Sequence, residues 1–457
     1  MAIVDGGGSR VGEIDRAVEE QTERWLERLA ELVAQPSISS QNVGMEETAE
    51  MVAGLLRRSG FETRLMPTGS YPVVYGEAAG RAERTLLCYN HYDVQPPEPL
   101  DLWESPPFEA TRRDGKMYGR GIQDDKGQLI SRLAAIQAVR DVLGELPCRI
   151  KFIVEGGEEI SSPFIPEFVE ENRDLLAADA CVWETGGIGY DGLPLLVLGM
   201  RGICYVQLNV RDMQRDAHSG SAHILPNAAW RLVRALESIK DEQEHILIDG
   251  FYSEVREPSD RELQLLHALP DQDEQIRRAY GIDSFLLNRS GFEGHRAVFL
   301  PTANIAGLSA GYEAEGPKTV IPAAAMAKMD FRLVPDQDPR DILEKLRRHL
   351  EAHGFYDVEV EYLGGERPGV TPADDPFVRL TAETAEQVYG TAPRIIPLMG
   401  GSGPIAPFRD YLDVPVVSLG ISHPESMVHA PNEHIRIDQF VRGTKHMARL
   451  VDAFGAS

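Results

Sequence analysis

Residues 85–96 read Thr85-Leu86-Leu87-Cys88-Tyr89-Asn90-His91-Tyr92-Asp93-Val94-Gln95-Pro96, so an imidazole and a carboxylate directly follow an apolar run. A second polar segment, Gly119-Arg120-Gly121-Ile122-Gln123-Asp124-Asp125-Lys126-Gly127, adds two adjacent carboxylates before a helical pattern. Charged side chains at the ends of apolar strands are costly to bury unless they are paired or bind a cation. The two segments together therefore predict a metal site.

Apolar runs and helical patterns alternate on either side of these segments, which is typical of an α/β sheet covered by helices. The predicted strands are Pro72–Tyr75, Thr85–Tyr89, Arg149–Val154, Ala180–Trp183 and Val414–Leu419, and the predicted helices include Gly127–Leu143, Pro376–Tyr389 and Ile437–Phe454. Ligands of such sheets gather at the carboxyl ends of the strands. His91, Glu158 and Glu184 each come just after a predicted strand.

The pattern changes near residue 203. Ile203–Val210 alternates polar and apolar side chains, as a half-exposed antiparallel strand does. Further alternating strands, a few helices and the charged segment Asp241–Arg296, predicted to be helical in part, follow before the α/β pattern returns. We therefore predict a mixed-sheet α/β catalytic domain built from residues 1–202 and 367–457, with an inserted α+β lid or dimerisation domain at residues 203–366.

Composition limits the classes of protein to consider. A chain of 457 residues favours two domains, and its formal net charge of −26 argues against nucleic acid or an anionic membrane as partner. Its four cysteines lie in apolar contexts without a CxxC pair, which indicates buried free thiols in a reducing compartment. No secretory signal pattern and no membrane-spanning run is visible, so the expected location is the cytoplasm.

Six side chains form the candidate metal-binding and catalytic set: His91, Asp124, Glu158, Glu159, Glu184 and His429. Two histidines and three carboxylates would suit a pair of divalent ions that share one bridging carboxylate. The remaining carboxylate could then act as a base on water activated by the ions.

Several motifs in chain order closely resemble metallopeptidase family 20, which includes aminoacylase-1, glutamate carboxypeptidase and the cytosolic non-specific dipeptidases. The dipeptidase branch is the most similar. The motifs are His91–Pro96, Trp103–Phe108, Asp114–Gly121, Asp124–Gly127, Glu155–Glu159, Leu198–Gly202, Ala217–Gly220, Lys318–Pro322 and Phe331–Pro335.

This resemblance implies two divalent ions per subunit, with zinc expected first and manganese or cobalt as alternatives. One ion would be held by His91, Asp124 and Glu184, and the other by Asp124, Glu159 and His429. Asp93 would orient the imidazole of His91, and Glu158 would be the general base. The Asp124–Asp125 peptide is expected to be cis. Glu184 departs from the dipeptidase branch, which often has Asp at this position, so denticity and metal preference could differ.

The resemblance also assigns residues of the inserted domain and the loop near residue 400. His218 would reach into a partner subunit's active site and polarise the scissile carbonyl, which requires a homodimer formed through the inserted domain. Arg332 would bind the carboxylate of the substrate, and Asn304 and Ser402 would be further substrate contacts.

The implied function is that of an exopeptidase that cleaves dipeptides or short peptides. An N-acyl- or N-carbamoyl-amino-acid amidohydrolase on the same scaffold is the alternative, because both kinds of substrate offer a carboxylate to Arg332. A metal-free binding protein is disfavoured, since every candidate position carries a competent group.

Overall fold

The computed structural model describes residues 6–456 and divides into two compact units. The first comprises the chain up to Gly199, Val370–Pro397 and the chain from Pro404 onward. The second comprises Met200–Gly369 together with the short segment Leu398–Gly403. That short segment is a feature that the sequence pattern did not separate from residues 367–457.

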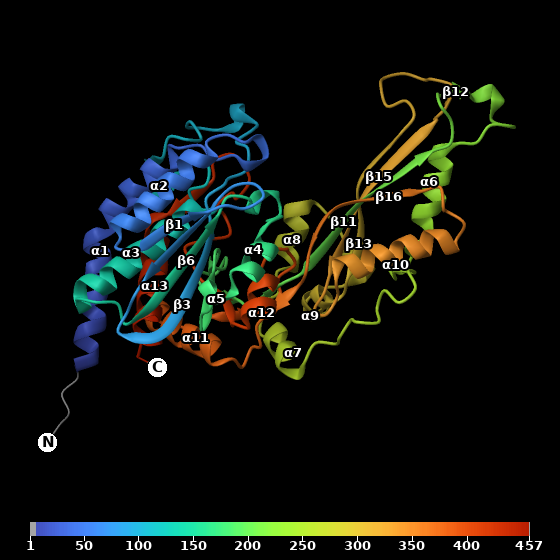
Figure 1. Ribbon diagram of the computed structural model, residues 1–457. Helices are drawn as coiled ribbons and strands as arrows, with labels where there is room; N and C mark the ends of the chain where they lie inside the picture. Colours follow the sequence, from blue (N-terminus) through green and yellow to red (C-terminus); the bar gives the residue numbers. More distant parts are fainter. Residues whose placement is uncertain (1–5, 457) are drawn as a thin grey trace. The chain divides into compact units, whose positions relative to one another are not determined.

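A mixed sheet forms the centre of the first unit, as the sequence predicted (Figure 1). Within residues 6–456 it has nine strands, in the order β1-β2-β6-β3-β7-β19-β9-β18 with β8 beside β9. The bounds are β1 (Glu62–Met66), β2 (Val73–Ala78), β3 (Ala82–His91), β6 (Cys148–Glu155), β7 (Ala180–Trp183), β8 (Gly187–Ile188), β9 (Pro194–Val197), β18 (Arg394–Ile396) and β19 (Val416–Ser418). The neighbours β6, β3, β7 and β19 are mutually parallel, so their carboxyl ends lie at one edge.

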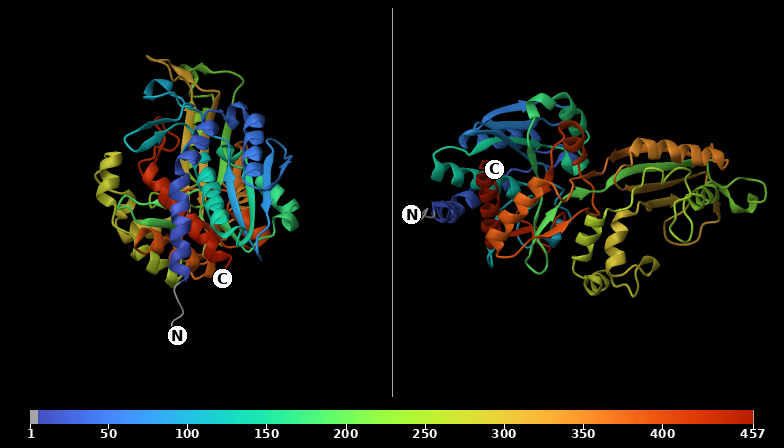
Figure 2. Two further views of the ribbon diagram at one scale, coloured as in Figure 1. Left: turned by 90° about the vertical axis from the view of Figure 1, so that its left-hand side faces the viewer. Right: turned by 90° about the horizontal axis from the view of Figure 1, so that it is seen from below.

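Helices cover both faces of this sheet (Figure 1). One layer contains α1 (Gly6–Val33), α2 (Met45–Arg58), α3 (Lys126–Leu143), α11 (Pro376–Tyr389) and α13 (Ile437–Phe454), and the other contains α4 (Ile165–Glu171), α5 (Arg173–Leu176) and α12 (Ala406–Leu412). Phe408 of α12 packs edge-on against Tyr89 and Trp183 of the sheet. The helices α1 and α13, from opposite ends of the sequence, lie side by side (Figure 2, left) and are joined by an ion pair between Asp15 and Arg449.

The sequence predicted α3 within one residue because its apolar positions and its ends are both locally marked. Most of its length is buried between the sheet and the helices α1 and α13. Gly144 ends the helix in the left-handed conformation with φ of 79°, where glycine has no steric penalty. This helix begins two residues after Asp124 and therefore fixes where that carboxylate emerges.

The second unit contains a four-stranded antiparallel sheet in the order β13 (Thr302–Ala310), β15 (Ala324–Leu333), β11 (Gly202–Arg211) and β16 (Glu359–Glu366). Alternate residues of β11 are buried, which confirms the half-exposed strand expected there. The helices α6 (Ala228–Glu237) and α10 (Pro339–Ala352) share one apolar core with the buried face of this strand. The charged segment Asp241–Arg296, which the sequence predicted to be helical in part, contains α7 (Asp260–His267), α8 (Asp273–Tyr280) and α9 (Phe292–Arg296).

Short strands that the sequence did not predict complete both units. In the first unit, β4 (Thr111–Arg113), β5 (Lys116–Tyr118) and β20 (His434–Arg436) form a small sheet, and in the second, β12 (Ala217–His218) pairs with β14 (Val320–Ile321). The four cysteines are buried free thiols, as expected. No helix within residues 6–456 is long and apolar enough to cross a membrane.

Candidate functional site: a carboxylate–imidazole cluster

The ends of three parallel strands bring the candidate side chains of the first unit together. His91 is the last residue of β3, Glu184 follows β7 directly, and Glu158 and Glu159 follow β6 after two glycines. A one-turn 3-10 helix, Glu158–Ile160, carries the last two carboxylates. The apolar strands thus decide the position of each polar group, because their register in the sheet is set by burial of both faces.

Asp124 lies between the two histidines. Its Oδ1 is 3.1 Å from Nε2 of His91, and its Oδ2 is 3.1 Å from Nε2 of His429. The Asp124–Asp125 peptide that carries it is cis, as the resemblance implied.

Each histidine also faces a second carboxylate. The Nε2 atom of His91 is 3.9 Å from Oε2 of Glu184, and Nε2 of His429 is 3.1 Å from Oε2 of Glu159. One ligand atom each from Asp124, Glu159 and His429 lies within 4.8 Å of the other two. The donor atoms therefore form two groups that share Asp124.

These groups fit divalent cations. Oε1 of Glu159 and Oε2 of Glu184 are buried and have no hydrogen-bond partner within residues 6–456. Buried carboxylate oxygens without partners are expensive unless a cation neutralises them. Imidazole nitrogens and carboxylate oxygens are also the ligand types that zinc, manganese and cobalt accept.

The pKa values at the cluster reflect an excess of negative charge. The contacts of His429 with Asp124 and Glu159 raise the pKa of this histidine to about 10. Burial opposes protonation of His91, but Asp124, Asp93 and nearby carboxylates still raise its pKa well above the ordinary value. Burial, together with the charge of Glu158, raises the pKa of Glu184 well above its usual range. The cluster thus favours positive charge at its centre.

Asp93 contacts His91 through two of its oxygens. The Nδ1 atom of His91 is 3.1 Å from the main-chain oxygen of Asp93 and 3.3 Å from its Oδ1. The same carboxylate accepts hydrogen bonds from the backbone N–H groups of Glu158 (3.2 Å) and Glu159 (3.0 Å). One fully buried side chain therefore orients the imidazole and holds the turn that carries the two glutamates.

The charges of the cluster act on the pKa of Glu158. Burial raises the pKa of Glu158 well above the ordinary value, His91 opposes this, and the carboxylates Asp124, Glu159 and Asp93 add to it. Its neighbour Glu159 is held by Gln95, whose Nε2 donates to Glu159 Oε2 at 2.8 Å. Adjacent residues on one turn thus have different surroundings.

Asp125 and Lys126, from which the sequence predicted only a part in shaping the loop, stabilise that loop from inside. Asp125 Oδ2 accepts from Asn90 Nδ2 (2.6 Å) and from the N–H of His91 (3.1 Å). Lys126 is fully buried and donates to the carbonyl oxygens of Leu32 and Gln35, near the end of α1.

Arg132 of α3 is a further buried residue that the sequence analysis missed. Its guanidinium donates to the carbonyl oxygens of Tyr89, Trp183 and Glu184 and to the side chain of Asn90. It therefore joins the ends of β3 and β7. An arginine within a helical pattern gives no local signal for such contacts.

The second unit brings three of its four candidate substrate residues together. Arg332 Nη1 donates to Ser402 Oγ at 2.7 Å, and Arg332 Nε is 3.7 Å from Asp330 Oδ1. Asn304 Nδ2 donates to Asp330 Oδ2 at 2.9 Å. Asp330, which the sequence analysis did not select, thus connects Asn304 with Arg332.

His218 has separate neighbours. Its Nδ1 accepts from the N–H of Gly220 at 3.0 Å, and its Nε2 is 3.2 Å from Thr319 Oγ1. It lies on β12, in a short two-stranded sheet distinct from the strands that carry Arg332 and Asn304.

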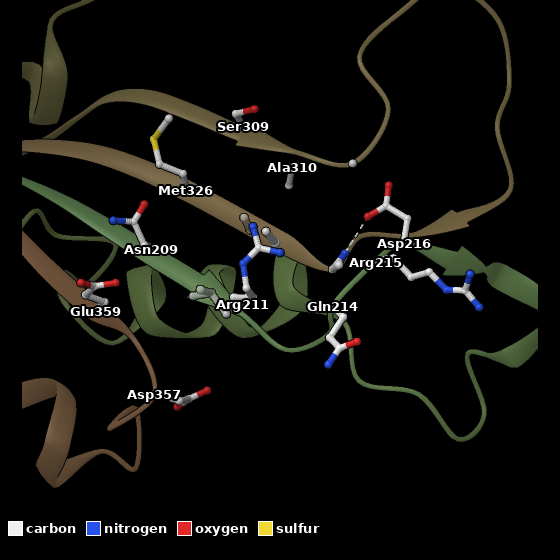
Figure 3. Close-up of a pocket in the computed structure, with 15 residues that line it drawn as sticks. Asn209, Arg211, Gln214, Arg215, Asp216, Ser309, Ala310, Met326, Asp357 and Glu359 are labelled. Carbon is white, nitrogen blue, oxygen red and sulfur yellow. Dashed lines mark hydrogen bonds between the residues drawn. The ribbon is translucent and has the colours of Figure 1, made fainter.

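A cavity of about 730 Å³ in the second unit shares no residue with these candidate sets. Its lining includes Arg211 and Arg215 and the acidic side chains Asp216, Asp357 and Glu359 (Figure 3). The Oδ1 atom of Asp216 accepts a hydrogen bond from the backbone N–H of Ala323 at 2.9 Å (dashed line in Figure 3). Two arginines and three carboxylates line this open cavity, so it offers charges of both signs and does not select one class of ligand.

Known proteins with related sequences and structures support the metal-site interpretation. The model of peptidase family M20/M25/M40 matches residues 87–453. Human Beta-Ala-His dipeptidase is 30% identical over 395 residues, which cover 82% of this chain and 76% of that protein. The Cys-Gly metallodipeptidase DUG1 of Saccharomyces cerevisiae is 29% identical over 467 residues, covering 95% and 96% of the two chains.

Among solved structures, the M20 family metallo-carboxypeptidase Sso-CP2 from Sulfolobus solfataricus aligns with a TM-score of 0.90 and 36% identity. The alignment covers 95% of this chain and 99% of that chain. The fold and the cluster define a hydrolase that depends on divalent metal ions. The chain belongs to peptidase family M20/M25/M40, so the bond it hydrolyses is a peptide bond.

Proposed function

We propose that this chain is a two-metal exopeptidase that cleaves dipeptides or short peptides. The observation that carries the proposal is the position of Asp124 between two histidines. Its Oδ1 is 3.1 Å from Nε2 of His91, and its Oδ2 is 3.1 Å from Nε2 of His429. A carboxylate shared in this way suits two neighbouring cations.

His91, Asp124 and Glu184 would hold one ion, and Asp124, Glu159 and His429 the other. We favour zinc, because two histidines with carboxylates are common zinc ligands, and manganese or cobalt would also suit the donors. The ions would supply Lewis acidity, which polarises the peptide carbonyl and lowers the pKa of water.

Glu158 would serve as the general base. It would take a proton from the attacking water and return it to the departing amine nitrogen. Its raised pKa suits a group that must both accept and give up a proton. The carboxylate of Asp93 would keep Glu158 in place by accepting a hydrogen bond from the backbone N–H of Glu158. Asp93 would also keep the imidazole of His91 oriented.

Arg332 and Ser402 would bind the carboxylate of the substrate. A guanidinium recognises a carboxylate through paired, charge-assisted hydrogen bonds, and Ser402 already shares one of its donors. Asn304 would add a contact through Asp330.

The names of the relatives favour a peptide substrate over an N-acyl or N-carbamoyl amino acid. Two are dipeptidases, whereas the metallo-carboxypeptidase of Sulfolobus solfataricus has the higher identity, 36%. That identity makes cleavage of longer peptides from the carboxyl end a specific second candidate. Both activities need a free carboxylate at the end of the substrate.

A homodimer through the inserted domain, with His218 acting in the partner's site, completes the proposal. Its support is a set of exposed apolar side chains on and before α6: Ile224, Trp230 and Val233 are 73%, 64% and 42% exposed. Exposed apolar surface of this kind is typical of interaction sites. We further propose a cytoplasmic location, in keeping with four buried free thiols.

The test is hydrolysis of a matched substrate panel by protein loaded separately with zinc, manganese and cobalt. The panel contains dipeptides, the corresponding tripeptides, their carboxyl-terminal amides and N-acetyl amino acids. Hydrolysis of dipeptides but not of the amides is expected. Efficient release of carboxyl-terminal residues from tripeptides would favour a carboxypeptidase activity. Turnover of N-acetyl amino acids without any turnover of peptides would contradict the proposal.

A further inference from the structure

The carboxylate of Glu433 is fully buried in the loop between β19 and β20 and accepts four hydrogen bonds. Its Oε2 accepts from Arg120 Nη1 (2.8 Å) and from the N–H of Gly121 (3.0 Å). Its Oε1 accepts from the N–H groups of Gln123 (2.9 Å) and Asp124 (3.1 Å). All four partners are donors, so only a group that accepts with both oxygens satisfies them.

The contacts of Glu433 join the two loops that carry Asp124 and His429. Glu433 follows His429 by four positions in one loop, and its carboxylate holds the backbone of Asp124 in the other. Its main-chain oxygen also accepts from the N–H of Gly119 at 3.0 Å. Arg120 extends the connection, since its Nη2 donates to the carbonyl oxygen of Pro96, beyond His91 and Asp93.

The two loops have little regular structure of their own to hold this arrangement. His429 lies in the left-handed region with φ of 60°, and α3 begins only at Lys126. Backbone N–H groups in such a loop must find acceptors when they are buried. Glu433 supplies the acceptor for three of them and ties the loop to that of His429.

We propose that Glu433 is a positioning residue that sets the spacing between Asp124 and His429 before any ion binds. This inference rests on the proposed function, in which these two side chains hold a shared pair of divalent ions. Glu433 is proposed to bind neither substrate nor ion, because both of its carboxylate oxygens accept from protein donors. It acts through the backbone of Asp124 and the loop of His429.

The variant Glu433→Gln tests this role with almost no change in volume. The amide of glutamine offers one accepting oxygen and one NH2 group, which would oppose the N–H groups that the carboxylate now accepts. The matched control is Glu262→Gln in the second unit. Glu262 is also buried, pairs with Arg256 through both oxygens, and accepts from the N–H and Oγ of Ser259.

The metal-free proteins are titrated with cobalt(II). Calorimetry measures the affinity and stoichiometry of binding, and visible absorption records the spectrum of the bound ion. The wild type and Glu262→Gln should bind two ions per chain with matching spectra. Glu433→Gln should bind at least one ion tenfold or more weakly, with a changed spectrum, as loss of ligand support does elsewhere. Unchanged stoichiometry, affinity and spectrum in a folded Glu433→Gln protein would overturn the inference.

A second measurement needs no variant. Hydrogen exchange of the metal-free wild type should show slow exchange at the amides of Gln123 and Asp124, because Glu433 holds them without an ion. Rapid exchange there would overturn the inference even if Glu433→Gln failed to fold. A wild type that binds fewer than two cobalt ions would overturn the proposed two-metal site as well. Neither readout depends on peptide hydrolysis.

Discussion

The carboxylate of Asp93 accepts a 3.0 Å hydrogen bond from the backbone N–H of Glu159, although 66 positions separate the two residues. The same carboxylate lies 3.3 Å from Nδ1 of His91. The segment that carries His91 and Asp93 and the turn that carries Glu158 and Glu159 are therefore joined directly, although they are separate in the sequence. Disturbance of this connection should affect both halves of the cluster together.

Substitution Asp93→Asn should weaken binding of zinc by about 10- to 100-fold, since it removes the charge that orients His91 and holds the glutamate turn. Competition with a chromogenic chelator would measure the affinity. Asp179→Asn is the matched control, because Asp179 accepts a backbone N–H (2.7 Å) at Thr85, near the other end of β3. Equal zinc affinity in the two variants would contradict the role of Asp93.

Replacing Glu158 with Gln should lower kcat by about 100- to 10,000-fold, because proton transfer would lose its base. KM and metal content should change little, since Glu158 is proposed to hold no ion. Steady-state kinetics and elemental analysis on the same sample would measure both. Loss of metal in parallel with loss of activity would instead show that Glu158 is a ligand.

For Arg332→Met, we expect the preference for free-acid peptides over carboxyl-terminal amides to fall by about 10- to 100-fold, the worth of a hydrogen bond to a charged group. The comparison of kcat/KM for each acid and amide pair measures this preference. Arg347→Met, on α10 of the same unit, removes an exposed arginine that pairs with Glu344 and should leave the preference intact. A preference that survives in Arg332→Met would place carboxylate recognition elsewhere.

If His218 acts in a partner's site, His218→Ala and Glu158→Ala proteins should each be inactive but should regain part of the activity when their subunits exchange. Native mass spectrometry would confirm exchange before activity is assayed. The added substitution Trp230→Glu should produce monomers and abolish the recovery. Exchange without recovery would indicate that His218 acts within its own subunit.

The stability of the fold should decrease on the acid side partly through His446, which is buried in α13 and bonded to the carbonyl oxygen of Thr381. Burial lowers the pKa of His446 to about 4, below the value of about 6.5 in an unfolded chain. The unfolded state therefore binds the proton first as the pH falls. Stability from this residue is present above about pH 6.5 and is lost as the pH falls to about 4, by roughly 3 kcal/mol.

Denaturant unfolding between pH 7 and pH 4 would measure this loss. His446→Gln, which does not titrate, should show a shallower decrease than the wild type. Part of the decrease should remain, because burial also lowers the pKa of His423 to about 4. Identical pH profiles for the two proteins would exclude a contribution from His446.

Much of the fold followed from local patterns. The helices Pro376–Tyr389 and Ile437–Phe454 and the strand Ala180–Trp183 have the predicted bounds, because apolar periodicity and flanking Pro and Gly mark them. The segment Asp241–Arg296 was predicted to be helical in part, but the bounds of its three helices were not, since they are short and lie in a highly charged segment. The strands β5 and β20 are three residues long, too short for any periodicity.

The sequence by itself determined the chemical inventory of this protein: which histidines and carboxylates follow apolar strands, and hence that a cation belongs among them. The family resemblance implied how these groups pair, but only the tertiary structure shows what holds them in place. It placed the two oxygens of Asp124 against His91 and His429, and it made Glu433 the acceptor for the loop of Asp124 from 309 positions away. The physical reason is that apolar periodicity and capping act between near neighbours in the chain. A hydrogen bond between distant loops leaves no pattern in either loop until the fold brings them together.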